Sequence, residues 1–110
     1  MVKNRVVRAT EFLQQCLKET GLDVSKILLF GSQSRGEATE ESDIDILIIS
    51  EDFQGKDIFE RAKLTKYAEI TATKKFMVPF DIITLTPDEF ENETSPIAEY
   101  AKKGKLMYRV

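Results

Sequence analysis

Residues 27–49, ILLFGSQSRGEATEESDIDILII, contain two strand-like runs separated by a polar segment. The run at 27–30 is continuously apolar, and the run at 43–49 is apolar apart from two aspartates. Short apolar runs of this kind are typical of strands that are buried on both faces. Gly31 and Ser32 end the first run, as expected for a tight turn. The stretch therefore predicts two buried strands at the centre of the fold.

One helical pattern precedes this stretch, and helical and strand patterns alternate after it. Apolar residues at three- and four-residue steps predict amphipathic helices. Ser or Thr followed by Pro predicts the start of a short helix. The predicted elements are helices at 4–20, 57–75, 86–90 and 95–103, a helical turn at 33–36, and strands at 80–85 and 105–110. This order predicts an α/β (α+β) fold in one domain, residues 1–110, with a small mixed β-sheet of three or four strands flanked by helices.

Two details of the helices are also predicted. Gly21 is well placed as the first residue after the first helix, where a left-handed conformation is common. In the second helix, four apolar residues are expected on or near one face: Ile58, Ala62, Leu64 and Ala68. Phe12, Leu13 and Tyr67 are interpreted as core residues, with an interface as the alternative.

The composition excludes several kinds of site. The sequence has no histidine and one cysteine, Cys16, so a catalytic triad with histidine, a His-ligated zinc site and an internal disulfide are all excluded. A metal must then bind to oxygen ligands, which favours Mg²⁺, Mn²⁺ or Ca²⁺. A net charge of −3 argues against an extended nucleic-acid interface. The absence of a signal-like or membrane-spanning apolar segment and the single cysteine lead us to expect a cytoplasmic protein.

Three aspartates are candidate metal ligands. Asp43 and Asp45 stand two residues apart on one predicted strand, so their side chains should share a face. Two carboxylates on an apolar strand repel each other, and a divalent cation turns that repulsion into coordination. Asp81 lies in the apolar strand 80–85, where a charge is expected to be paired or metal-bound. Each aspartate taken alone could instead be a solvated or capping residue. Together they suit a two-metal site for phosphoryl transfer.

Candidate phosphate ligands precede the two aspartates. Gly31 allows a ligand to approach the backbone closely, and Ser32 adds a hydroxyl donor. Arg35 adds a cation suited to phosphate oxygens. A plain tight turn and a solvated arginine are the alternatives. The combination with the aspartates at a neighbouring strand end favours a phosphate site.

These residues resemble the nucleotidyltransferase superfamily typified by DNA polymerase beta. The family pattern is Gly-Ser, a gap of about ten residues, Asp-x-Asp and a later aspartate on a strand. Gly31, Ser32, Asp43, Asp45 and Asp81 match it. The context GSxxRGEAxxxSDIDI is most similar to the minimal, MNT-type members of bacteria and archaea, and the resemblance covers nearly the whole chain.

The resemblance implies a Mg²⁺-dependent transfer of a nucleoside monophosphate from an NTP, with ATP expected, to a hydroxyl group. Asp43, Asp45 and Asp81 would hold two Mg²⁺ ions and be the catalytic residues, and Gly31, Ser32 and Arg35 would bind the phosphates. It also implies an antitoxin role, in which AMP is transferred to a tyrosine of a small helical HEPN-type toxin. The alternatives are transfer to a small molecule or an RNA end, and masking of a partner without catalysis. A homo- or hetero-oligomer is compatible with each.

Overall fold

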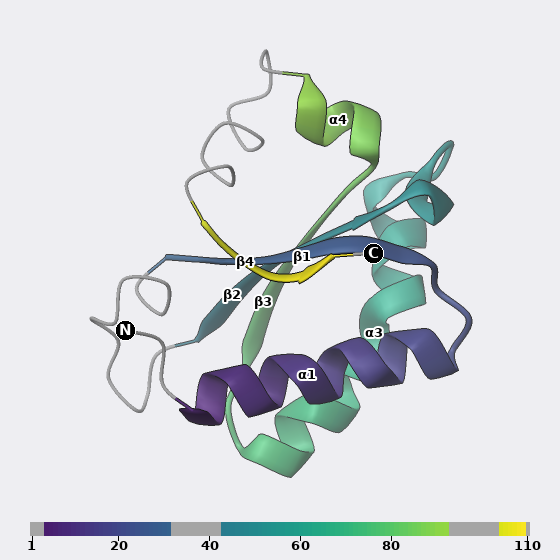
Figure 1. Ribbon diagram of the computed structural model, residues 1–110. Coiled ribbons are helices and arrows are strands. Elements are labelled where there is room, and N and C mark those ends of the chain that lie inside the picture. The colour runs from purple at the N-terminus through teal and green to yellow at the C-terminus, as the bar shows by residue number, and fades with distance from the viewer. Residues whose placement is uncertain (1–3, 32–42, 93–103, 110) are drawn as a thin grey trace.

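The helices and strands follow the predicted order (Figure 1). This computed structural model describes residues 4–31, 43–92 and 104–109. The elements are α1 (Asn4–Glu19), β1 (Val24–Phe30), β2 (Ile44–Ser50), the 3-10 helix η1 (Glu51–Phe53), α3 (Ile58–Phe76), β3 (Phe80–Leu85), α4 (Pro87–Glu91) and β4 (Lys105–Arg109). The predicted turn at 33–36 and the predicted helix at 95–103 lie outside the described residues.

A mixed sheet forms the centre of the described structure, as predicted. Its four strands have the order β3-β2-β1-β4. β1 is antiparallel to both β2 and β4, whereas β2 and β3 are parallel. The connection between these parallel strands runs through α3. The last residue of β1 and the first residues of β2 and β3 consequently lie at the same end of the sheet.

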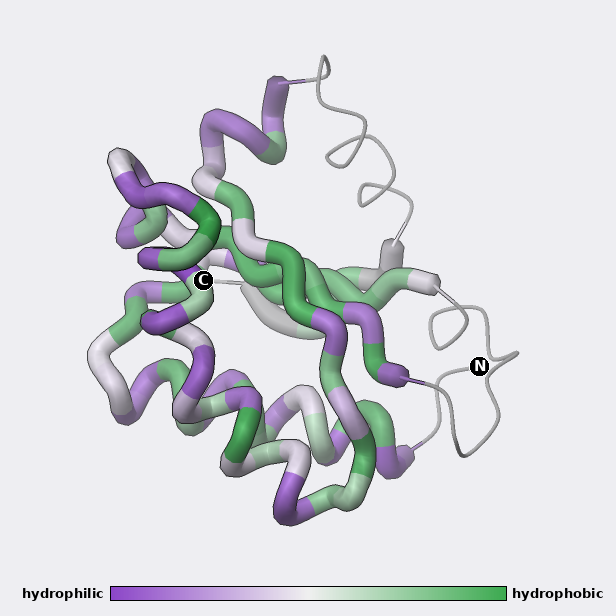
Figure 2. Tube along the Cα trace, turned by 180° about the vertical axis from the view of Figure 1, so that it is seen from behind, coloured by the Kyte–Doolittle hydropathy of each residue, from purple (hydrophilic) through white to green (hydrophobic). Residues whose placement is uncertain are grey.

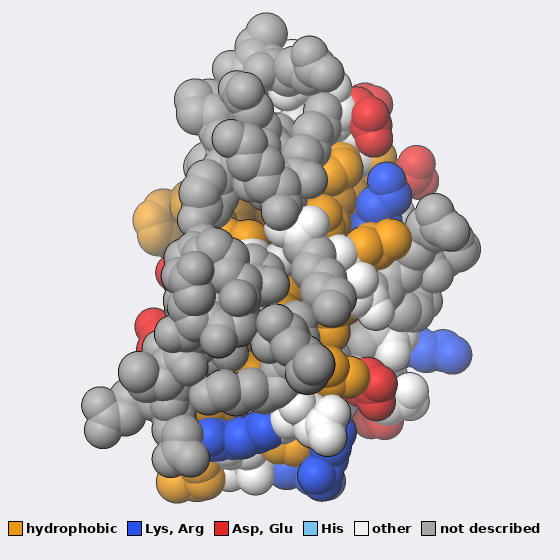
Figure 3. All heavy atoms as spheres, turned by 60° about the vertical axis from the view of Figure 1, so that its left-hand side comes forward, with side chains coloured by type: hydrophobic (Ala, Val, Ile, Leu, Met, Phe, Trp, Pro, Cys, Tyr) orange, Lys and Arg blue, Asp and Glu red, His pale blue; other side chains and the backbone are white. Residues whose placement is uncertain are grey.

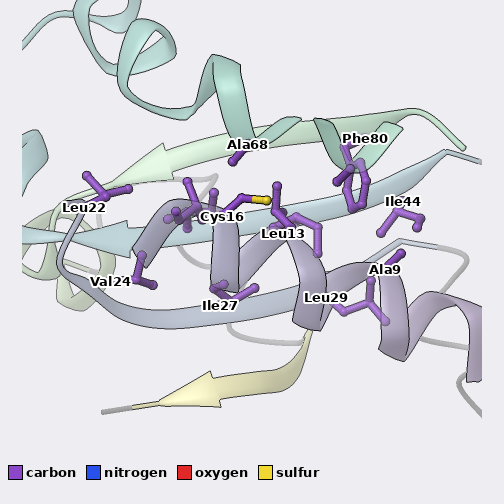
Figure 4. Close-up of a cluster of buried hydrophobic side chains, with 14 of the residues drawn as sticks. Ala9, Leu13, Cys16, Leu22, Val24, Ile27, Leu29, Ile44, Ala68 and Phe80 are labelled. Carbon is purple, nitrogen blue, oxygen red and sulfur yellow. The ribbon is translucent and has the colours of Figure 1, made fainter. Parts of the chain in front are cut away.

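Helices cover both faces of the sheet. α1 and α3 pack on one face (Figure 1), where Leu13 and Cys16 of α1 and Ala68 of α3 join strand residues such as Ile27 and Phe80 in one buried cluster (Figure 4). On the opposite face a smaller cluster includes Phe90 of α4. Hydrophobic residues predominate along the strands, whereas they alternate with hydrophilic ones along the helices (Figure 2). The sheet is therefore buried on both faces over its central part.

The helix ends have the predicted signals. Gly21 has a φ of 88° and follows α1, and the N–H groups of Gly21 and Leu22 donate to the carbonyls of Lys18 and Leu17. This is the hydrogen-bond pattern of a Schellman motif. Thr86 is the N-cap of α4 and forms a capping box with Glu89, and Pro87 lies in the first turn of the helix. Local chemistry alone thus defines where both helices begin or end.

Three predictions about local structure were wrong. β1 begins at Val24, three residues earlier than expected, because its pairing with β2 continues past the apolar run. Ile58 and Ala62 do not share a side of α3 with Ala68, since both are exposed, whereas Ala68 is buried. Tyr67 is also exposed and is not a core residue. The apolar residues of α3 lie on both sides of the helix, so the sequence pattern did not define its buried side.

An ion pair ties α3 to α4. The Arg61 guanidinium donates to both carboxylate oxygens of Glu89, at 2.7 and 3.3 Å. It also donates to the backbone carbonyls of Lys56 and Thr84, and it lies over the Phe53 ring. The hydrogen bond from Arg61 holds the pKa of Glu89 below its usual range, although partial burial opposes the shift. The pair therefore links α3, on one face of the sheet, to α4, on the other face.

We expect Glu89→Gln to lower the free energy of unfolding by about 0.5–1 kcal/mol at neutral pH, since the Glu89 side chain is partly exposed and solvent screens the pair. A glutamate whose pKa is lowered in the folded state contributes stability above its ordinary pKa, and this contribution is lost as the pH falls. The difference between the variant and the wild type should therefore shrink below about pH 4. Urea unfolding at two pH values measures it, with Glu91→Gln, an exposed residue of the same helix, as the control. An equal loss in both variants, or one independent of pH, would contradict this account.

Within the described residues, no helix combines the length and the apolar character that crossing a membrane requires.

Candidate active site

The strand register brings two of the predicted aspartates together. Asp45 of β2 is the direct partner of Asp81 in the parallel pair with β3, and it is also opposite Phe30 of β1. Side chains of neighbouring strands at the same register position project to the same face. Asp45 and Asp81 therefore lie side by side at one end of the sheet, on the face that α4 covers farther along. Gly31 directly follows Phe30 at this end.

Two predictions about the aspartates need correction. Asp43 is not in the strand, because β2 begins at Ile44, although Asp43 directly precedes it. Asp81 is in β3 as predicted, but its side chain is exposed. β3 is the edge strand of the described sheet, and its first residues are open to solvent on this face. The argument that Asp81 must be a buried charge was therefore wrong, even though its position beside Asp45 supports a role in a shared site.

Burial and neighbouring negative charges disfavour the ionised form of Asp45. Partial burial raises the pKa of Asp45, and the negative charges of Asp81 and Asp43 raise it further. Glu69 of α3 belongs to the same electrostatic environment. Burial raises the pKa of Glu69 first, and the charge of Asp81 adds to the shift. Glu69 could not be identified from the sequence, because its interaction with Asp81 depends on the packing of α3 against β3.

Gly31 is held tightly against Asp45. Its φ is 72°, a left-handed conformation that favours glycine. A Cβ atom at this position would overlap Oδ2 of the Asp45 carboxylate. Glycine is therefore required at position 31 for two reasons: the left-handed turn after β1 and the close approach of the Asp45 side chain.

We expect Gly31→Ala to displace the Asp45 carboxylate and to impair nucleotide binding more than folding. The control is Gly55→Ala: Gly55 has a φ of 74°, but a Cβ there would meet no atom within 4 Å. Both variants should lose roughly 1–2 kcal/mol of stability through the left-handed backbone. Only Gly31→Ala should also weaken ATP binding, by about tenfold or more. Thermal unfolding and calorimetry of both variants measure the two effects. Similar ATP affinity in the two variants would show that the contact with Asp45 is unimportant.

The remaining predicted site residues, Ser32 and Arg35, lie outside the described residues. Among the residues that are described, no three acidic or sulfur-bearing side chains are grouped closely enough to hold a metal ion as they stand. The donor set nevertheless fits a hard divalent cation. Asp45 and Asp81 are adjacent oxygen donors. Burial raises the pKa of Asp45 first, and the charges of Asp81 and Asp43 raise it further; a divalent cation would offset these charges.

Figure 3 displays the face beside the N-terminus, of which only part consists of described residues. Among the described side chains that are visible in Figure 3, acidic and basic groups are interspersed with apolar ones.

Comparison with known proteins identifies a family and similar folds. The family model of the nucleotidyltransferase domain matches residues 10–106. A 40-residue segment is 52% identical to "Putative protein adenylyltransferase MJ1305" of Methanocaldococcus jannaschii, and it covers 36% of this chain and 27% of that relative. The structure is similar to the crystal structure described as "a putative nucleotidyltransferase from Sulfolobus solfataricus" (TM-score 0.69, 20% identity, 96% of this chain and 81% of that one). It is also similar to a "toxin-antitoxin with AMP-PNP" (TM-score 0.64, 19% identity, 98% and 75%).

The structural similarities show the fold, and the family match extends over most of the chain. It includes Gly31, Asp43, Asp45 and Asp81. The fold and the family match agree with the resemblance inferred from the sequence. This chain belongs to the nucleotidyltransferase domain family and has the polymerase beta-like fold of its minimal members.

Proposed function

We propose that this protein transfers AMP from ATP to a hydroxyl group of a partner protein, at the site formed by Asp43, Asp45 and Asp81. The observation that carries the proposal is the register of β2 and β3, which pairs Asp45 with Asp81 beside the tight Gly31 turn. This places carboxylates and a close backbone approach at one end of the sheet. An ordinary surface turn has no need of both.

The three carboxylates are the residues that would hold Mg²⁺. When bound, the ions would neutralise the charge of the phosphates and make the acceptor hydroxyl more acidic. The absence of a Cβ at Gly31 leaves room for the Asp45 carboxylate, so Gly31 would contribute to phosphate binding through its backbone. Ser32 and Arg35 supply a hydroxyl and a guanidinium for the β- and γ-phosphates. Most of the rate enhancement would come from positioning and charge neutralisation.

The reaction is an in-line displacement at the α-phosphorus of ATP. The acceptor oxygen forms a bond to this phosphorus, and the bond from the phosphorus to the oxygen that bridges to the β-phosphate breaks. Pyrophosphate is the leaving group. The proton of the acceptor hydroxyl passes to the Asp81 carboxylate, which is exposed and lies beside Asp45. The products are an AMP ester of the acceptor and pyrophosphate.

A protein is the acceptor class that we favour. In-line attack requires a tightly held hydroxyl, and a folded partner that docks over the site supplies that orientation. Two named relatives support this choice: the adenylyltransferase from Methanocaldococcus jannaschii carries "protein" in its name, and one structural neighbour is a toxin–antitoxin pair. We therefore propose an antitoxin whose partner is a small helical HEPN-type toxin, with a tyrosine as the acceptor. The curated relatives are matched over only about a quarter of their own length, 27 and 28%.

Intact-mass spectrometry of the partner tests the proposal. The product of the adjacent gene is co-expressed with the wild-type chain or with a chain that carries Asp45→Asn, and its mass is compared. We expect the mass of one or more AMP groups only with the wild type, on a side-chain hydroxyl. AMP found on an RNA end or a metabolite, with none on protein, would remove the antitoxin role and leave the nucleotidyl transfer. Inhibition of the partner without any mass change would favour masking.

A further inference from the structure

One face of α3 points away from the sheet and combines apolar and basic side chains. We call it the α3 outer face and define it by Phe59, Lys63, Lys66, Tyr67, Ile70 and Lys74. These positions follow one another at spacings that place them on one side of a helix. The opposite side of α3 is the buried one, since Thr65, Ala68 and Ala72 are its buried residues.

The apolar residues of this face are unusually open to solvent. Phe59 is 76% exposed, Tyr67 60% and Ile70 43%. Single exposed apolar residues are common on protein surfaces, but a row of them on one helix marks an interaction site. Aromatic residues are also enriched in protein interfaces. Tyr67 belongs to this row of exposed residues, and the prediction that it lies in the core was therefore wrong.

The charges of the α3 outer face are all positive, although the whole chain has a net charge of −3. Lys63, Lys66 and Lys74 are exposed, and no ion pair involves them in the described part of the chain. The two glutamates of α3 are engaged elsewhere. Glu60 closes the capping box with Asp57, and Glu69 is half-buried and lies within the electrostatic influence of Asp81. The complementary surface must therefore be apolar and acidic.

We infer that the α3 outer face is the docking site for an acidic amphipathic helix of a partner protein. A second copy of this chain is disfavoured, because two outer faces would bring lysines against lysines. An anionic membrane is also disfavoured. In membrane-surface helices the basic residues lie outside the inserted apolar side, whereas Lys63 and Lys66 stand between Phe59 and Ile70 on this face. Carboxylates of a partner helix would pair with these lysines directly.

The direction of α3 connects this face to the active site. Met77, which is 80% exposed, follows α3 and is separated from Asp81 by three residues. The start of β3 is joined to the start of β2 by a hydrogen bond from the N–H of Ile44 to the carbonyl of Pro79. One end of a helix that lies along α3 would thus reach the end of the sheet that carries Asp45 and Asp81. This link to the acceptor rests on the proposed function, whereas the docking itself does not.

A charge-swap experiment with a synthetic helix tests the inference. The probe is a fluorescent peptide of about 20 residues, with leucines at three- and four-residue steps and glutamates beside them; a second peptide has lysines in place of the glutamates. Fluorescence anisotropy measures binding to the full chain. We expect the acidic peptide to bind with a Kd of about 10–100 µM, since a single helix buries less than a standard interface. Binding should weaken at about 0.5 M salt.

Two pairs of variants locate the binding. Lys63→Glu combined with Lys66→Glu should weaken the acidic peptide by about tenfold or more and make the lysine peptide bind, whereas Lys18→Glu on α1 should do neither. Ile70→Ser should weaken binding by about tenfold. Leu106→Ser should have little effect, although Leu106 of β4 is 45% exposed and so resembles Ile70 in accessibility. All four variants should keep the wild-type affinity for ATP and Mg²⁺, which shows that the fold and the nucleotide site are intact.

Four results would overturn the inference: no binding of the acidic peptide, equal losses in the paired variants, tighter binding of the wild type to phosphatidylserine vesicles or to a single-stranded oligonucleotide, and self-association that Ile70→Ser abolishes. If the wild type binds the acidic peptide but not ATP with Mg²⁺, the docking site stands and the proposed function fails. If the wild type binds ATP with Mg²⁺ but not the acidic peptide, the proposed function stands and the docking site fails.

Discussion

Replacing Asp45 by asparagine is expected to abolish Mg²⁺-dependent binding of ATP, with a loss of affinity of at least about 100-fold, or about 2.7 kcal/mol. Asp45 is central to the site, because it pairs with Asp81 across the strands and contacts the Gly31 turn. Asparagine keeps the shape of the side chain and removes the charge that a cation requires. Asp43→Asn should have a similar effect. Calorimetry with ATP, in the presence of Mg²⁺ or of a chelator, measures the loss.

The stability of the metal-free Asp45→Asn variant separates this effect from misfolding. The pKa of Asp45 is raised in the folded protein, so the folded state binds a proton more readily than the unfolded chain. The metal-free wild type should therefore gain stability as the pH falls toward that raised pKa. Asp45→Asn should be at least as stable as the wild type at neutral pH and should lose this pH dependence. Asp88→Asn, at an exposed position of α4, is the control. A destabilised variant, or one that still binds ATP only with Mg²⁺, would be inconsistent with the assigned role.

Asp81→Asn is expected to have a different outcome, namely a fall in transfer of about 100- to 10,000-fold with a change in ATP affinity of less than about tenfold. Asp81 is more exposed than Asp45, and we assign it the acceptor side of the site, where it takes the proton of the attacking hydroxyl. Single-turnover transfer at saturating ATP, together with calorimetry, separates the two effects. Transfer near the wild-type rate would remove Asp81 from the catalytic residues. Complete loss of ATP binding would instead place Asp81 with Asp45 in holding the nucleotide.

Much of the fold could be predicted from local signals. The continuous apolar runs identified β1 and β2, and capping residues identified the boundaries beside Gly21 and Thr86. Such signals act within a few residues and can be read directly from the sequence. The pairing of Asp45 with Asp81 is different in kind. It depends on β2 and β3 being parallel neighbours through α3, which the sequence pattern allowed but did not specify.

The failures have a common physical cause. The exposure of Asp81 follows from its place on the edge strand of the described sheet, and that of Tyr67 from the way α3 rotates to bury Ala68 and Ala72. Both are consequences of tertiary packing. The α3 sequence has apolar residues on two sides: Ala68 and Ala72 are fully buried against the core, Leu64 and Phe76 pack against it while partly buried, and other large residues remain exposed. Phe59, Tyr67 and Ile70 are exposed on the α3 outer face. An exposed group of large apolar residues is typical of an interaction site.

The central claim is that the site transfers the α-phosphoryl group of ATP together with its nucleoside. The most direct measurement incubates the protein, Mg²⁺ and the co-expressed partner with ATP that is labelled either at the α- or at the γ-phosphorus. We predict that the α-label becomes attached to protein and that the γ-label is released as pyrophosphate, with both processes absent after Asp45→Asn. Attachment of the γ-label to protein would show a kinase reaction and contradict the account, as would release of labelled inorganic phosphate alone.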